Sequence, residues 1–257
     1  MGRLITISLW VLLWGIQTAW SQFPGANVQT HLSGASAVAD IALIASGTGT
    51  TGGGTTTSQT VAITIPGSTA QVVLFMAITV QRASGAVPAV TAVTYNGSAT
   101  GITAVGSQTN TTDTRQNSYI YALVNPTRDG TSRNIVFTID NAAWVVAAGL
   151  AYANVDQSTP YANANTSEGT NSSPTVTISS AADDLVFAHC GHRDDLETFT
   201  TNASQVERYN LATTVNSGSV GVSGAGSDEA GAASVAMDYT TSGTGAWSCV
   251  GMSIQKG

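Results

Sequence analysis

The sequence predicts an all-β protein, a jelly-roll-like antiparallel β-sandwich, and two observations indicate this fold class. Short runs of β-branched and other apolar residues alternate with clusters of Gly, Pro, Asn and Asp along most of the chain. After residue 21, no stretch shows the 3.6-residue apolar periodicity of an amphipathic helix. About a dozen short strands separated by turn residues are typical of a sandwich or a jelly roll.

Two of the expected strands, 72–80 and 144–152, are apolar at nearly every position. Strands covered on both faces have this pattern, so we expect both in the middle of a sheet. Asn96-Gly97 predicts a hairpin turn because both residues tolerate positive φ. The expected strands are Ile41–Ala45, Thr60–Ile65, Gln71–Gln81, Val90–Tyr95, Ile102–Gly106, Ser118–Val124, Asn134–Ile139, Trp144–Ala153, Thr175–Ser179, Leu185–His189, Gln205–Tyr209, Ser234–Tyr239 and Ala246–Ile254.

The composition suits an exported β-protein and argues against a nucleic-acid partner. Charged residues make up 9% of the 257 residues, against about 25% in an average protein. The net charge is −7, and Lys256 is the only lysine. Binding to nucleic acid or to an anionic membrane surface needs a basic patch, and the sequence has none. Thr, Ser, Asn and Gly carry the polarity instead.

The N-terminus has the pattern of a secretory signal peptide. Arg3 is followed by an apolar run from Leu4 to Ile16, which is shorter than the roughly 20 residues that span a bilayer. Ala19 and Ser21 are small residues at the two positions that a signal peptidase reads. We therefore expect a signal peptide at 1–21, secretion to the cell surface or beyond, and no membrane association after cleavage. The alternatives are an uncleaved anchor or a buried N-terminal strand.

The rest of the chain is expected to form one domain with a short extension before it. The sandwich is predicted over 40–257, and 22–39 is an N-terminal extension. Residues 46–58 are rich in Gly and Thr, and we expect a loop inside the domain there. Its string 47–52 matches the dinucleotide-binding fingerprint, but no helix pattern follows to bind a pyrophosphate.

His189, Cys190 and His192, followed by Asp194, Asp195 and Glu197, form the densest group of metal-binding residue types. On a regular strand the two histidines face opposite sides, so a shared ion would need a bulge or turn, which Gly191 would permit. A calcium site from Asp194, Asp195 and loop carbonyls is a variant of this hypothesis. The alternative is a strand end that leads into a solvated acidic loop.

The sequence shows no constellation that carries catalysis, so we expect a protein that is not an enzyme. A nucleophile elbow requires Gly-x-Ser-x-Gly, and 221–225 lacks the last glycine. Asp183 and Asp184 fall in a turn pattern and fit turn chemistry better than paired catalytic carboxylates.

Cys190 and Cys249 are the two cysteines of the chain. An even number in an exported protein favours a disulfide. Each lies in an expected strand, so a bridge requires that these strands are neighbours or face each other across the sandwich. The alternative is two buried free thiols.

Several short segments occur in a recognisable order along the chain. They are Ile41–Leu43, Val93–Gly97, Tyr121–Pro126, Asn154–Pro160, Asp184–Val186, Gly231–Val235, Trp247 and Ser253–Ile254. Together these segments resemble a β-sandwich module that recurs in bacterial exported proteins and in phage structural proteins. The resemblance spans roughly residues 40–257 and implies a single domain, but it implies no activity and no site residues. The His189–His192 segment is not part of the pattern.

Three functions are consistent with these features. The first is an exported structural or adhesive surface protein that self-assembles into an oligomer or filament, with Ala35–Ala45 adding to a sheet edge of a neighbouring copy. The second is a carbohydrate-binding module, with or without calcium, by analogy with other jelly rolls. The third is a phage virion protein, against which the predicted signal peptide argues.

Overall fold

A computed structural model describes residues 40–113, 115–193, 197–215 and 220–257. These residues form fifteen β-strands and no helix, which confirms the predicted all-β antiparallel sandwich. Accordingly, no described segment is a long apolar helix that would cross a membrane. The predicted signal peptide and the extension at 22–39 lie outside the described residues.

The strands follow one another with turns and loops between them. Their bounds are β1 (Ala42–Thr50), β2 (Thr56–Thr64), β3 (Val73–Gln81), β4 (Val90–Tyr95), β5 (Ile102–Thr109), β6 (Gln116–Val124), β7 (Ser132–Ala153), β8 (Tyr161–Gly169), β9 (Thr175–Ile178), β10 (Leu185–His192), β11 (Phe199–Thr201), β12 (Val206–Ala212), β13 (Ser223–Ala230), β14 (Val235–Thr241) and β15 (Trp247–Ile254).

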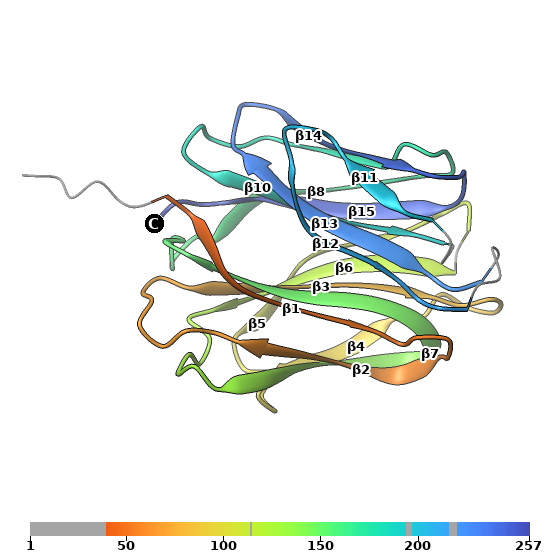
Figure 1. The fold of residues 1–257 in the computed structure, drawn as a ribbon, viewed down its shortest axis with the longest axis horizontal. Helices are drawn as coiled ribbons and strands as arrows, with labels where there is room; N and C mark the ends of the chain where they lie inside the picture. The colour runs from red at the N-terminus through yellow and green to blue at the C-terminus, as the bar shows by residue number, and fades with distance from the viewer. Residues whose placement is uncertain (1–39, 114, 194–196, 216–219) are drawn as a thin grey trace, which may run out of the picture. The chain divides into compact units, whose positions relative to one another are not determined.

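The strands are arranged in four layers (Figure 1). The first half of β7 pairs with β2 and β4 and forms outer sheet I. The second half pairs within inner sheet I, whose order is β1-β7-β3-β6-β5. Inner sheet II has the order β12-β13-β10-β15-β8, and outer sheet II has the order β11-β14-β9. The long strand β7 thus curves from one layer into the next.

Each neighbouring pair of layers encloses a hydrophobic core. The core between outer and inner sheet I includes Phe137 of β7, the one between the two inner sheets includes Phe75 of β3, and the one between inner and outer sheet II includes Phe199 of β11. Successive residues of β3 point into the first and the second core in turn, and all nine are buried. This confirms that the continuous apolar runs at 72–80 and 144–152 mark strands covered on both faces.

The sequence predicted a loop over the Gly/Thr tract at 46–58, and this prediction is wrong. β1 continues to Thr50 and β2 begins at Thr56. A Cβ at Gly49 would lie 2.9 Å from the carbonyl oxygen of Thr60 in β2. The glycines therefore allow the β2 backbone to pack directly onto β1, and this packing outweighs their weak strand propensity.

The Asn96-Gly97 turn is confirmed, but the hairpin is not. Both residues have positive φ, 52° and 78°, and Tyr95 and Ser98 exchange backbone hydrogen bonds around them. The strands then separate, because β4 joins β7 in outer sheet I whereas β5 joins β6 in inner sheet I. The turn chemistry fixes the reversal of the chain, and the cores fix where each strand pairs.

Five edge strands carry bulges that the central strands of the two inner sheets lack. One extra residue interrupts the pairing of each of five edge strands, β1, β4, β5, β8 and β12. Pairing among β3, β6 and the second half of β7, and among β10, β13 and β15, runs without a shift. Bulges at sheet edges hinder the addition of a foreign strand.

Side-chain amides occupy the edges of the small outer sheet II. Asn163 and Asn165 of β8 donate to the carbonyl oxygens of Ser179 and Thr177 on the β9 side, at 2.8 and 2.9 Å. On the opposite edge, Asn210 donates to the carbonyl of Phe199 at 2.8 Å. These backbone acceptors are therefore not available to another chain.

Candidate functional site

The two histidines of the predicted metal site point into different cores. β10 pairs with β13 and β15 without a register shift, and Gly191 lies directly opposite Gly224 and Ser248. The bulge that a shared ion would require is therefore not there. His189 lies between the two inner sheets, and the His192 ring packs edge-on against Phe199 on the other side.

The acidic residues that follow do not complete a described metal site. Asp194 and Asp195 lie outside the described residues. The Glu197 carboxylate accepts hydrogen bonds from the Ser242 hydroxyl, at 2.6 Å, and from the Gly243 amide. Within the described ranges, no three His, Cys, Asp or Glu side chains are grouped so that they would bind one metal ion. The structure thus does not bring His189 and His192 together.

His189 is instead the centre of a buried polar network that joins the two inner sheets. Its Nε2 lies 2.8 Å from the Thr79 hydroxyl, and its Nδ1 lies 2.8 Å from the Tyr209 hydroxyl and 3.3 Å from the Ala225 carbonyl oxygen. A neutral ring satisfies all three contacts when Nδ1 carries the proton and Nε2 accepts from Thr79. Full burial lowers the pKa of His189 to about 4, so the ring is neutral at pH 7.

The network continues across inner sheet I to β15. The Thr79 hydroxyl lies 2.8 Å from the Ser118 hydroxyl, which in turn lies 2.8 Å from the Ser248 hydroxyl. Thr79 and His189 have the spacing of a nucleophile and its base, but both are fully buried, so a substrate would not reach them in this state. These partners were not predictable from the sequence, because Thr79 is 110 residues from His189 in the chain.

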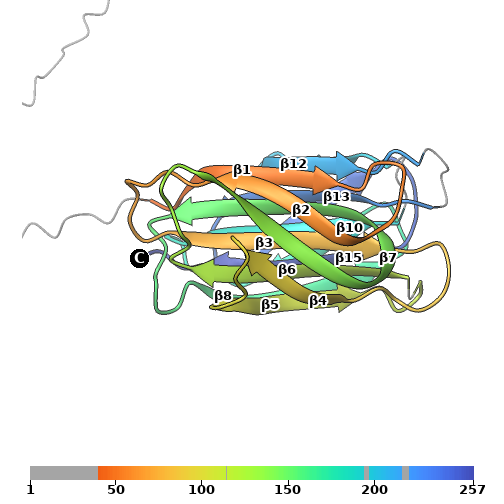
Figure 2. The ribbon, with the colours of Figure 1, turned by 90° about the horizontal axis from the view of Figure 1, so that it is seen from below.

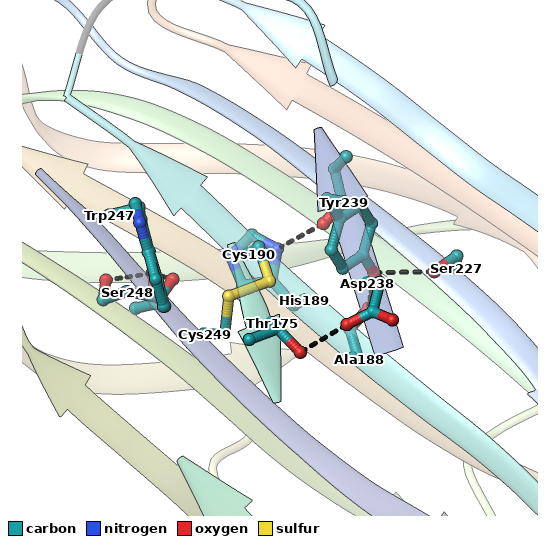
Figure 3. Close-up of a disulfide and its surroundings, with 12 residues drawn as sticks. Thr175, Ala188, His189, Cys190, Ser227, Asp238, Tyr239, Trp247, Ser248 and Cys249 are labelled. Carbon is teal, nitrogen blue, oxygen red and sulfur yellow. Dashed lines mark hydrogen bonds between the residues drawn. A yellow bond between two sulfur atoms is a disulfide. The ribbon is translucent and has the colours of Figure 1, made fainter. Parts of the chain in front are cut away.

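Cys190 and Cys249 form a disulfide with an S–S distance of 2.04 Å. They are directly opposite each other on the neighbouring strands β10 and β15, which confirms the bridge and selects neighbouring strands over an inter-sheet link. Both cysteines are fully buried in the core between inner and outer sheet II. Figure 3 shows the bridge between the side chains of Trp247 and Tyr239.

A buried ion pair, not predicted from the sequence, lies on inner sheet II. Asp228 is 1% exposed and accepts two hydrogen bonds from Arg208, at 2.6 and 2.7 Å, and one from the Tyr152 hydroxyl at 2.8 Å. The bidentate pairing with Arg208 and the third donor, Tyr152, satisfy the hydrogen-bonding capacity of a carboxylate that is buried away from solvent. Burial, followed by the neighbouring Asp228 charge, raises the pKa of Tyr152 well above its ordinary value, so this phenol remains a donor.

A second charged cluster connects loops at one end of the inner sheets. Asp113, before β6, pairs with Arg115 at 2.6 Å and also with Arg193, which follows β10. Burial by itself raises the pKa of Asp113, and the hydrogen bonds and charges of the two arginines outweigh it, so the pKa lies below its ordinary value. The cluster ties inner sheet I to inner sheet II.

One row of polar side chains near this end is poorly satisfied. Gln81 and Gln116 are directly opposite each other on β3 and β6 and are fully buried. Neither amide atom of Gln116 has a hydrogen-bond partner among the described residues, nor does the Gln81 Oε1 atom. Such groups are rare in native interiors and each lowers stability.

An open groove lies between edge strands β4 and β5. Its cavity volume is about 300 Å³. It is lined by Val90, Thr91, Ala92, Val93, Ala99, Ile102, Ala104 and Tyr121. Tyr121 stacks on Tyr119, with the ring centroids 6.0 Å apart and the planes 15° from parallel.

Comparison with known proteins does not assign the chain to a group. No family model, no curated protein and no solved structure matches it.

Proposed function

We propose that the protein is an exported structural and adhesive protein that acts at the cell surface or in the extracellular space. The Cys190–Cys249 disulfide carries this proposal. Disulfides persist in oxidising compartments and are rare in the cytosol of most organisms. A bridge at the centre of inner sheet II, together with the signal-peptide pattern of 1–21, supports export.

The two outer faces support a role at a wet surface. On outer sheet I the exposed side chains include Ser58, Thr60 and Thr138, and on outer sheet II they include Thr177 and Thr240. Exposed hydroxyl side chains are therefore present on both outer faces. Short neutral hydroxyl side chains keep a β-face hydrated without the long-range fields that attract or repel other macromolecules.

The edges constrain how such a protein would assemble. Ala42–Ala45, the second half of the predicted donor segment, pairs with β7 in its own chain, so Ala35–Ala45 is not available as a whole for strand addition. Five bulged edge strands also disfavour a foreign strand at those edges. Self-assembly, as we propose it, uses residues 22–39 and side-chain contacts.

Export is tested by expressing the full chain in a secreting host. We expect mature protein that begins at Gln22 and yields one disulfide-linked peptide containing Cys190 and Cys249 in non-reducing peptide mapping. The variant Ala19→Arg places a large charged residue in the cleavage motif, and it should remain unprocessed. Uncleaved wild-type chain confined to the cytosol would contradict the proposal.

Assembly is tested separately by electron microscopy of the mature protein with and without residues 22–39. Oligomers or filaments that disappear on deletion support self-assembly. Monodisperse monomers in both preparations would contradict self-assembly and leave the export test unaffected.

A further inference from the structure

The sandwich of outer and inner sheet I has two lateral sides, and they differ. On one side β1 and β2 belong to different sheets and do not pair with each other, but they pack closely and close the space between the layers, because Gly47 and Gly49 let the β2 backbone lie directly on β1. On the other side β4 and β5 are edge strands of different sheets and do not pair (Figure 2). The groove of about 300 Å³ opens there, at the small end of the roughly 300–1,000 Å³ typical of ligand sites.

Small and neutral side chains line this groove. Three alanines, Ala92, Ala99 and Ala104, create the hollow, and the only ionisable side chain is that of Tyr121. Burial raises the pKa of Tyr121 further above its ordinary value, so the phenol is protonated at any physiological pH. A charged ligand would find no counter-charge in the groove.

Tyr121 is also the one aromatic side chain among the residues that line the groove. The hydroxyl of its neighbour Tyr119 accepts a hydrogen bond from Asn117 at 2.6 Å. No described residue makes a hydrogen bond with the Tyr121 hydroxyl. Tyr121 therefore offers a ligand both an aromatic ring and a free hydrogen-bonding group.

A peptide strand does not suit the walls of this groove. Thr91 is the extra residue of β4 and Val105 is the extra residue of β5, so both ladders are interrupted beside the groove. The Thr91 hydroxyl already donates to Thr138 at 3.3 Å. An added strand needs a continuous row of backbone donors and acceptors, and neither edge provides one.

We propose that the groove between β4 and β5 binds a neutral sugar, with one face of the sugar ring on Tyr121 and a sugar hydroxyl bonded to the Tyr121 hydroxyl. A pyranose is compact and uncharged, and it combines an apolar C–H face with a rim of hydroxyls. These properties match an apolar hollow that has one aromatic ring and one free phenol. Such a site would be the place where the proposed adhesive protein contacts its partner, so its biological role rests on the proposed function. The binding experiment does not depend on that function.

The test is saturation-transfer difference NMR on purified mature protein. The probes are glucose, galactose, mannose, N-acetylglucosamine, cellobiose and chitobiose, with octyl glucoside as a probe for acyl chains. We expect transfer to the ring protons of at least one sugar. Tyr121→Phe should weaken binding by roughly 5- to 10-fold, which is the loss of about one hydrogen bond.

Two further variants separate the groove from the rest of the surface. Ala104→Leu fills the hollow directly opposite Tyr121 on β5 and should abolish transfer. Ala164→Leu makes the same change at an exposed position of edge strand β8 and should leave transfer intact. Thermal unfolding of both variants checks that they are folded.

Three results would overturn the sugar proposal. They are no transfer to any sugar, equal transfer in wild type and in folded Ala104→Leu, and transfer to the octyl chain alone. Because the assay uses purified protein, each of these results is independent of the export and assembly tests.

Discussion

His189 of inner sheet II and Thr79 of inner sheet I form a hydrogen bond of 2.8 Å across the central core. Both side chains are fully buried, and the tight packing of Gly191 against Thr79 keeps the two sheets close at this level. A neutral imidazole fits the contact, because the ring accepts from Thr79 through Nε2. The protonation state of one residue is therefore coupled to the packing of the two inner sheets.

Protonation of His189 should destabilise the fold in mild acid. Its pKa is about 4 in the folded protein, against 6.5 for an ordinary histidine, so the unfolded chain binds the proton more tightly. The stability that His189 contributes is complete above pH 6.5 and is lost as the pH falls from 6.5 towards 4. At pH 5 we expect a loss of about 2 kcal/mol in the free energy of unfolding, measured by urea denaturation at pH 7.5 and pH 5.

The control for this prediction is His189→Gln, which retains hydrogen-bonding groups but does not titrate. It should be less stable than wild type at pH 7.5, and its stability should fall less between the two pH values. An unchanged pH dependence in His189→Gln would show that other groups cause the acid sensitivity.

The disulfide should stabilise the protein substantially. The bridge closes a loop with a sequence separation of 59 residues, and on the chain-entropy model this is worth about 4 kcal/mol. We expect the double variant Cys190→Ala and Cys249→Ala to lose that amount in guanidinium denaturation. Full burial of both sulfurs also predicts slow reduction by dithiothreitol in native buffer and fast reduction in denaturant. Equally fast reduction in both conditions would show that dithiothreitol reaches the disulfide without unfolding of the protein.

The fold class and the central strands were predictable from the sequence because they depend on local patterns. The apolar run of β3 indicated burial on both faces, and Asn96-Gly97 indicated a tight turn. The strands β8, β11 and β13 were missed. β13 reads Ser-Gly-Ala-Gly-Ser-Asp-Glu-Ala, with no β-branched residue, since its glycines make room for larger neighbours. A Cβ at Gly226 would lie 2.5 Å from the Cζ atom of Tyr209.

The features of the candidate site that depend on a single strand were also predictable, whereas those that depend on contacts between sheets were not. The regular period of β10 correctly implied that His189 and His192 face opposite sides, and the two cysteines were correctly paired. The partners Thr79 and Tyr209 were not predictable, because they depend on how sheets distant in sequence stack. The groove at Tyr121 forms because β4 and β5 enter different sheets. The Asn96-Gly97 turn between them did not indicate this separation.

The buried ion pair of Asp228 should be costly to break. Asp228→Asn removes the charge that pairs with Arg208. Its amide has one oxygen in place of the two carboxylate oxygens that accept hydrogen bonds from Arg208 and Tyr152. Loss of one partner of a buried pair typically costs about 3–5 kcal/mol, and we expect the lower end because Arg208 is 24% exposed. The matched change Asp129→Asn, in a pair whose carboxylate is 48% exposed, should cost clearly less, because solvent screens an exposed ion pair. Similar losses in both variants, measured by urea denaturation, would contradict a special role of burial.

Replacement of Gln116 should stabilise the protein, in contrast to replacement of Asp228. Its side chain is fully buried, and neither amide atom has a partner among the described residues. Gln116→Met retains the length of the side chain and removes both unsatisfied atoms, so we expect a gain of about 1 kcal/mol. The control Gln108→Met changes a half-buried amide of β5 that donates to the Thr109 carbonyl at 2.7 Å. It should be neutral or mildly destabilising. A loss of stability in Gln116→Met, measured by thermal and urea unfolding, would show that the amide is satisfied in solution and contributes to the packing between the inner sheets.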